Sequence, residues 1–235
     1  MRPLLRARRS QLLGLMLSVV IPALNAGACL RACLAALGEV DELILVDGGS
    51  RDDTIAIAEA ARARVIVSPK GRGVQLRAGG DAARGDWLLF LHADTLLEPG
   101  WAEAARAHML RHPRKAACFR LRLDDPAWQA RAIERGVAAR VRLLGLPYGD
   151  QGLLVPRALY ERAGGFRPLP LMEDVDLVRR IGRRRLRLLA AGAVTSAERW
   201  RRDGWLRRSA RNLACLGLYT VGVPAERIAR LYERR

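Results

Sequence analysis

The feature that most constrains the fold is a regular alternation, over residues 17–91, of short apolar runs with stretches of helical periodicity. Residues 17–21, 42–46, 65–67 and 87–91 are short and rich in apolar or β-branched side chains, so we expect strands there. The segments between them show the apolar spacing of helices. This β-α-β-α-β-α-β order predicts an α/β fold with a doubly wound, mostly parallel central sheet and flanking helices.

The second half of the chain is less regular. Pro99 is expected to open a helix at the favoured first-turn position. Residues 117–123, 153–155 and 186–190 have the pattern of strands, and residues 128–144 and 173–184 that of helices. From residue 203 on, apolar residues recur at helical spacing with arginines opposite them, which predicts an amphipathic helix.

Positive charge is concentrated towards the C-terminus. The chain carries a net charge of +17, and residues 179–235 contain 16 arginines against four acidic residues. A basic amphipathic helical tail suits an anionic membrane surface or an anionic acceptor. Nucleic acid is the competing partner, but no aromatic-interleaved basic surface or known reader motif favours it.

We divide the chain into three parts. Residues 1–15 form a disordered leader or result from a misassigned start, residues 16–200 form the main domain, and residues 201–235 form the basic tail. No apolar run reaches the roughly 20 residues that span a bilayer. The four cysteines form no CxxC pair, which is typical of buried thiols in a reducing compartment. We therefore expect a cytoplasmic protein, peripheral on the cytoplasmic face of the cell membrane.

Polar and glycine residues follow each strand of the first half. The carboxyl ends of parallel strands meet at one edge of a sheet, where ligands bind in such folds. This rim is expected to collect the donor-side residues Pro22, Ala23, Asn25, Asp47, Gly48, Lys70, Arg72, His92 and Asp94.

These residue types fit a nucleotide diphosphate. The carboxylate of Asp47 can accept a hydrogen bond from a base, and Lys70 and Arg72 can add positive charge near phosphates. Asp94 offers a hard oxygen ligand for a divalent ion that neutralises a diphosphate leaving group. Each residue alone has an ordinary structural reading as a turn or cap, and only their shared edge favours function.

Acidic residues near position 174 supply the remaining chemistry. A carboxylate within reach of an acceptor hydroxyl can take its proton during attack, and we assign this role to Asp174. Acids in the first turn of a helix also stabilise its dipole, which is the structural alternative for this cluster, Glu173 included. Asp150 and Gln151 form a second polar patch that is either the acceptor side or a plain turn.

The chain resembles the family-2 glycosyltransferases of GT-A fold, in the single-domain form without transmembrane helices. The matching segments are SVVIPALN (18–25), LILVDGGSRDDT (43–54), PKGRGVQL (69–76), GDWLLFLHADT (85–95) and PLMEDVDLVRRI (170–181). The resemblance implies transfer of a sugar from a nucleotide-diphosphate donor, UDP- or GDP-linked, to an acceptor hydroxyl with inversion. It also implies a base contact at Asp47, a donor-side place for Gln75, a Mn²⁺ or Mg²⁺ ligand at Asp94, and a general base at Asp174.

The motifs depart from the family pattern at several positions. Gly48 replaces a usual second acid, and His92 replaces the first carboxylate of the DxD-type motif; His92 either ligates the ion or shapes the loop. The Gln-x-x-Arg-Trp motif of processive synthases appears only as Ser196-Ala197-Glu198-Arg199-Trp200, without its glutamine, which argues against processive synthesis. The single-domain form includes enzymes with carotenoid-like and other lipid acceptors, and a hydrophobic or lipid-linked acceptor is expected here.

Two other function classes remain as alternatives. A sugar nucleotidyltransferase would use a similar sheet and metal, but it needs a glycine-rich loop after the first strand, where this chain has Pro22 to Asn25. A non-catalytic basic module would bind nucleic acid or a membrane with steep salt dependence and no response to manganese. The chain lacks the Gly-x-Gly-x-x-Gly fingerprint after its first strand that a dinucleotide-dependent dehydrogenase needs.

Overall fold

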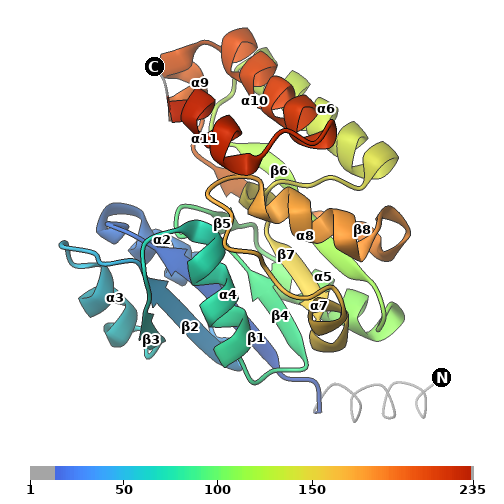
Figure 1. The fold of residues 1–235 in the computed structure, drawn as a ribbon. Helices are drawn as coiled ribbons and strands as arrows, with labels where there is room; N and C mark the ends of the chain where they lie inside the picture. The colour runs from blue at the N-terminus through green and yellow to red at the C-terminus, as the bar shows by residue number, and fades with distance from the viewer. Residues whose placement is uncertain (1–13, 234–235) are drawn as a thin grey trace.

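Eight strands within residues 14–233, the part of the chain that the computed structural model describes, form one mixed sheet (Figure 1). Their order across the sheet is β3-β2-β1-β4-β7-β6-β8-β5. The strands are β1 (Leu17–Ala23), β2 (Glu42–Asp47), β3 (Arg64–Val67), β4 (Trp87–Phe90), β5 (Leu96–Leu97), β6 (Ala116–Leu123), β7 (Leu153–Pro156) and β8 (Leu186–Thr195). The expected leader lies almost wholly outside the described residues.

The first four long strands are parallel, as the alternation predicts. β3, β2, β1 and β4 pair in parallel, and β6 pairs in parallel with β8. β7 is antiparallel to both β4 and β6, and the short β5 is antiparallel to β8. The predicted mostly parallel sheet with flanking helices is therefore confirmed, and β4 lies at its centre.

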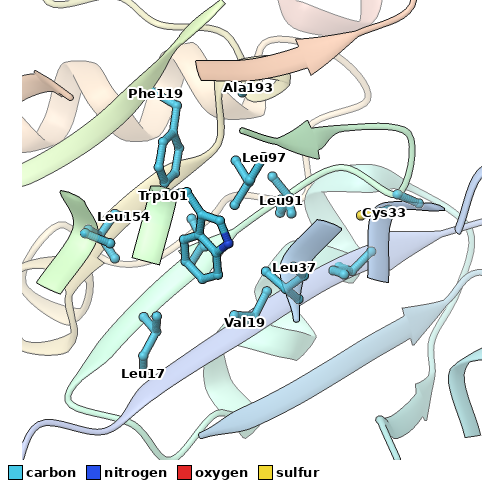
Figure 2. Packing of buried hydrophobic residues seen from close by; sticks show 14 of the residues in the cluster. Leu17, Val19, Cys33, Leu37, Leu91, Leu97, Trp101, Phe119, Leu154 and Ala193 are labelled. Atoms are coloured by element: carbon cyan, nitrogen blue, oxygen red, sulfur yellow. The ribbon is translucent and has the colours of Figure 1, made fainter. Parts of the chain in front are cut away.

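Helices cover both faces of the sheet and divide its core into two layers. On one face, α2 (Gly27–Leu37), α3 (Thr54–Ala60) and α5 (Trp101–Arg111) pack over Val19, Ile21 and Phe119 (Figure 2). On the other, α4 (Arg72–Ala82), α6 (Trp128–Leu144), α7 (Arg157–Arg162) and α8 (Glu173–Ile181) pack over Val20 and Leu88. Alternate residues of β1 thus serve opposite faces, as the period of a strand requires.

Three element boundaries differ from those expected. Pro99 does not open α5, because Gly100 takes a left-handed conformation (φ 85°) and the helix begins at Trp101. α8 ends at Ile181 because Gly182 also has a positive φ, and a 3₁₀ turn, η2 (Arg183–Arg185), follows. β8 continues beyond residue 190 to Thr195, since it pairs with β6 past a register shift between Cys118 and Arg120.

Three helices close the described chain: α9 (Glu198–Asp203), α10 (Trp205–Thr220) and α11 (Ala225–Glu233). The expected helix is present as α10, and part of its apolar surface faces solvent while one of its arginines is buried. Leu206 and Leu213 are 87% and 58% exposed, whereas Arg208 is only 6% exposed. α9 spans the boundary expected after Trp200 and packs with α10 and α6. Among residues 14–233, no helix has the length and apolar character needed to cross a bilayer.

Candidate active site

The loops that follow β1 and β2 are joined by side chains at the carboxyl edge of the sheet. Asn25, with a positive φ of 50°, accepts a hydrogen bond from the Arg51 N–H, and its own N–H donates to Ser50 Oγ. Gln75 Nε2 of α4 donates to the carbonyls of Ala23 and Val46 at 2.7 and 2.8 Å. The donor-side rim is therefore held by internal bonds.

Asp47 organises the loop that follows its own strand. Its Oδ2 accepts hydrogen bonds from the N–H groups of Gly49 and Ser50 at 2.8 and 2.9 Å, and the residue is only 1% exposed. A Cβ on Gly48 would lie 3.1 Å from Gln75 Nε2. This packing accounts for glycine at the position where an acid was expected.

One cavity of about 360 Å³ lies beside this rim. It brings together six of the residues expected at the site: Arg72, His92, Asp94, Asp150, Glu173 and Asp174. The other expected site residues are not among its lining: Pro22, Ala23, Asn25, Asp47, Gly48, Lys70, Gln75 and Gln151.

Arg72 contacts two groups in this cavity, the Glu173 carboxylate and the His92 imidazole. Its Nε lies 2.9 Å from Glu173 Oε1, and its NH1 lies 3.4 Å from His92 Nε2. Burial, helped by the charges of Arg72 and Arg199, lowers the pKa of His92 to about 3, so the imidazole is neutral. A guanidinium only donates, so His92 accepts through Nε2 and carries its proton on Nδ1. Because Nε2 faces a cation, the geometry favours His92 as a loop-shaping residue.

The acidic pair at the start of α8 is split between two environments. Glu173 is 1% exposed, and its Oε2 has no hydrogen-bond partner within the described residues. Burial and the neighbouring charge of Asp174 raise the pKa of Glu173 to about 7, although Arg72 opposes this. Asp174 is half-buried, and its Oδ2 accepts the Gly149 N–H at 2.5 Å.

The loop at Gly149 faces both carboxylates and the imidazole. A Cβ on Gly149 would lie 2.5 Å from His92 Nε2 and 3.4 Å from Asp174 Oδ2, so this approach requires glycine. Burial also raises the pKa of the adjacent Asp150 to about 6, with Arg140 opposing. Gln151 is fully buried, and its Nε2 donates to the carbonyl of Phe119.

The far wall of the cavity comes from the C-terminal third, which sequence reasoning did not assign to the site. Residues 196–200, which match the Gln-x-x-Arg-Trp motif only in part, contribute Ser196, Glu198, Arg199 and Trp200 to this wall. α10 and α11 complete the wall, and no sequence signal placed them there because the contact depends on tertiary packing. These lining residues are Ser196, Glu198, Arg199, Trp200, Arg208, Asn212, Cys215 and Tyr232.

Few side chains of the cavity are suited to bind a metal ion. No group of three or more His, Cys, Asp or Glu side chains within residues 14–233 is arranged to hold an ion. Asp94 is exposed within the cavity, directly after β4 and His92. Magnesium in nucleotide sites is commonly held by one or two carboxylates plus substrate phosphates and water, so a lone exposed Asp94 fits an ion that arrives with its nucleotide.

Sequence comparison agrees with this arrangement. Residues 18–162 match the family model described as glycosyl transferase family 2. A PGL/p-HBAD biosynthesis glycosyltransferase of Mycobacterium bovis (strain BCG / Pasteur 1173P2) is 41% identical over 93 residues, covering 35% of this chain and 36% of the relative. Glucosyl-3-phosphoglycerate synthase of Mycobacterium tuberculosis (strain H37Rv) is 37% identical over 98 residues, covering 35% of this chain and 30% of the relative. The match thus spans about a third of each relative's length.

Solved structures share the fold. TarS residues 1–349 from S. aureus superpose with a TM-score of 0.60 at 19% identity, covering 77% of this chain and 60% of that one. M. tuberculosis glucosyl-3-phosphoglycerate synthase, solved with Mg²⁺ and UDP, gives a TM-score of 0.57 at 23% identity, covering 81% and 73%. The expected GT-A-type architecture is confirmed. The family model covers more than half of the chain, and the chain therefore belongs to glycosyl transferase family 2.

Proposed function

We propose that this protein transfers a sugar from a nucleotide-diphosphate donor, UDP- or GDP-linked, to an acceptor hydroxyl with inversion at the anomeric carbon. One observation carries the proposal: a single cavity at the carboxyl edge of the sheet is lined by Asp94, Arg72 and Arg199 together with Glu173 and Asp174. This set supplies a metal ligand, cations for a diphosphate and a carboxylate base. The relatives whose names state a glycosyltransferase activity support the same reaction class.

The donor's nucleoside occupies the rim made by the loops after β1 and β2. Asp47 is almost fully buried, and it holds the loop of residues 48–50 in a fixed shape. This loop therefore contacts the base, and Asp47 contacts it once the loop has opened. Pro22, Ala23 and Asn25 border the ribose, and Gln75 positions the two strand ends without touching the donor.

The diphosphate lies between Asp94 and the two arginines of the cavity. A divalent ion, Mn²⁺ or Mg²⁺, would be held by Asp94 and would neutralise negative charge on the leaving diphosphate. Arg72 of α4 and Arg199 of α9 add fixed positive charge to the cavity. Lys70 lies exposed in the loop before Arg72. Fixed charges of this kind stabilise developing negative charge without reorganisation.

Asp174 acts as the general base. The acceptor oxygen attacks the anomeric carbon as its proton passes to the Asp174 carboxylate, and the bond from that carbon to the diphosphate oxygen breaks with its electron pair. The Gly149 N–H fixes one carboxylate oxygen of Asp174. Glu173 keeps Arg72 in place through their ion pair. Asp150 lines the acceptor side, and Gln151 braces the loop behind it.

The acceptor is hydrophobic or lipid-linked in this proposal. Apolar and aromatic side chains line the cavity beside its many charged and polar groups: Leu171 and Met172 directly before the acidic pair, and Trp200 and Tyr232 on the far wall. These side chains offer an apolar surface to an acceptor next to the acidic pair. We place the enzyme at the cytoplasmic face of the cell membrane, where the four thiols, all free within residues 14–233, stay reduced.

The test is a thermal-shift titration with UDP, GDP, dTDP, ADP and NAD, each with Mn²⁺ and with EDTA. A ligand that binds only the folded state raises the melting temperature. We expect a metal-dependent rise for one nucleoside diphosphate and none for NAD. If no nucleoside diphosphate raises the melting temperature, with Mn²⁺ or with EDTA, the result would contradict a donor site here.

A further inference from the structure

α10 buries Arg208 together with Cys215 and Leu216, yet it leaves a row of apolar and small residues exposed to solvent. We define the α10 outer stripe as the six exposed residues Leu206, Ala210, Leu213, Ala214, Gly217 and Val221. Their spacing of three, four and seven places them on one side of a helix. Leu206 is 87% exposed, and Val221, just after the helix, is 79% exposed. A surface helix ordinarily has the opposite arrangement.

The polar side of α10 is held by specific partners, which fixes the orientation. Arg208 NH1 and Arg211 NH2 each lie 2.9 Å from Asp203 Oδ2. Arg208 also lies over the Trp200 ring, with 4.9 Å between its Cζ and the ring centroid, and Arg211 lies over Tyr232 at the same distance. Rolling the helix to bury the stripe would break these contacts and expose the side that lines the cavity.

Charge around the stripe indicates which kind of surface covers it. Residues 179–235 hold 16 arginines against four acidic residues. The ion pairs of the three C-terminal helices use Arg201, Arg202, Arg208 and Arg211. Among the described side chains of these helices, the exposed Arg199, Arg207, Arg227 and Arg230 form no ion pair with an acidic residue. Arg207 directly follows Leu206 of the stripe. An apolar stripe on a strongly basic segment matches the boundary between headgroups and acyl chains of an anionic bilayer.

A second copy of the chain fits this face poorly. Pairing two stripes would bring two segments of the same strong positive charge together, and like-charge juxtaposition opposes association. An anionic lipid surface meets the apolar and the basic requirement at once.

We propose that the α10 outer stripe is a membrane-contact face that enters an anionic lipid surface. Arg208, Asn212 and Cys215 on the opposite side of the same helix line the cavity. The cavity is therefore separated from the lipid by about one helix diameter, roughly 10 Å. The membrane-contact face is inferred from the packing of α10 alone. That the face brings a lipid-borne acceptor to the cavity rests on the proposed function.

The experiment is co-sedimentation of the full chain with vesicles of phosphatidylcholine and phosphatidylglycerol in equal parts, compared with phosphatidylcholine alone. The test variant is Leu206→Asn with Leu213→Asn; both side chains are exposed, so the fold is retained. The matched control is Val67→Asn, which changes a side chain that is 72% exposed on β3. We expect wild type and control to bind the anionic vesicles, and the double variant to bind at least about tenfold more weakly.

Three results would overturn the proposal. Two concern vesicles: equal binding by the double variant, or no binding by wild type. The third is a wild-type dimer in light scattering that the double variant loses, which would show that a second copy covers the stripe. Thermal shift with nucleoside diphosphates is measured on the same samples. Vesicle binding without any nucleotide response would remove the proposed function and leave the membrane-contact face standing.

Discussion

Arg72, the first residue of α4, forms an ion pair of 2.9 Å with Glu173, the first residue of α8. The pair joins the loop after β3 to the acidic cluster, so the expected phosphate side and the expected base side of the site are coupled. The Glu173 side chain is 2% exposed and that of Arg72 is 41% exposed. Arg72 is therefore the member of the pair that a ligand can reach.

Replacing Arg72 by Gln is expected to weaken binding of the nucleoside diphosphate by about ten- to a hundredfold, the worth of one charged hydrogen bond. Isothermal titration measures the change. Arg106→Gln is the control, since Arg106 is an exposed arginine of α5, remote in sequence from the cavity residues. Equal affinity in R72Q and R106Q would remove Arg72 from the donor site.

Glu173→Gln is expected to change how stability depends on pH. A carboxyl group whose pKa rises from 4.5 to about 7 on folding binds more protons folded than unfolded between these values. The free energy of unfolding therefore falls as pH rises through this window, by at most about 1.4 kcal/mol per pH unit. Urea unfolding of wild type should show this fall relative to E173Q. Parallel pH profiles would contradict a raised pKa at Glu173.

Gly149→Ala is expected to destabilise the fold by about 1–3 kcal/mol, because the new methyl group would overlap His92 Nε2. The control is Gly136→Ala, in α6, where nothing lies within 4 Å of an added Cβ. That change should stabilise by about 0.5–1 kcal/mol, as alanine does in an open helix position. Urea denaturation compares the free energies of unfolding of the two variants. If G149A is as stable as wild type, the His92 ring moves aside at little energetic cost.

Asp174→Asn should separate catalysis from binding. The amide oxygen can still accept the Gly149 N–H, so the loop keeps its position, but the amide cannot take a proton. We expect donor turnover, followed as nucleotide release, to fall about 10²–10⁴-fold with donor affinity within about twofold. Retained turnover would move the base role to another carboxylate, and loss of donor binding as well would indicate a structural role.

The sequence was most informative where local pattern and tertiary environment agree. Residues of β1, β2 and β4 are apolar on both faces because helices cover both, so short continuous apolar runs were readable as buried parallel strands. The same logic found the rim residues, since position after a strand predicts the carboxyl edge. Three of these rim residues, Arg72, His92 and Asp94, meet in one cavity with the expected acidic residues Asp150, Glu173 and Asp174.

The C-terminal wall was not predictable in the same way. Periodicity identifies an amphipathic helix at α10, but it does not say which side meets the protein. That orientation is decided by Asp203, Trp200 and Tyr232, which form partners for the inward arginines only after the chain has folded. The resemblance implies a donor-side place for Gln75, and Gln151 is expected either on the acceptor side or in a plain turn, whereas the amide nitrogens of both donate to backbone carbonyls.

The central claim is a metal-assisted diphosphate site at Asp94, and isothermal titration of the nucleotide found by thermal shift tests it most directly. Wild type, Asp94→Asn and the control Glu103→Gln, an exposed carboxylate on α5, are titrated with Mn²⁺ and with EDTA. We expect Mn²⁺ to tighten binding in wild type and E103Q, and to have no effect in D94N. Full Mn²⁺ enhancement in D94N, or none in wild type, would contradict the account.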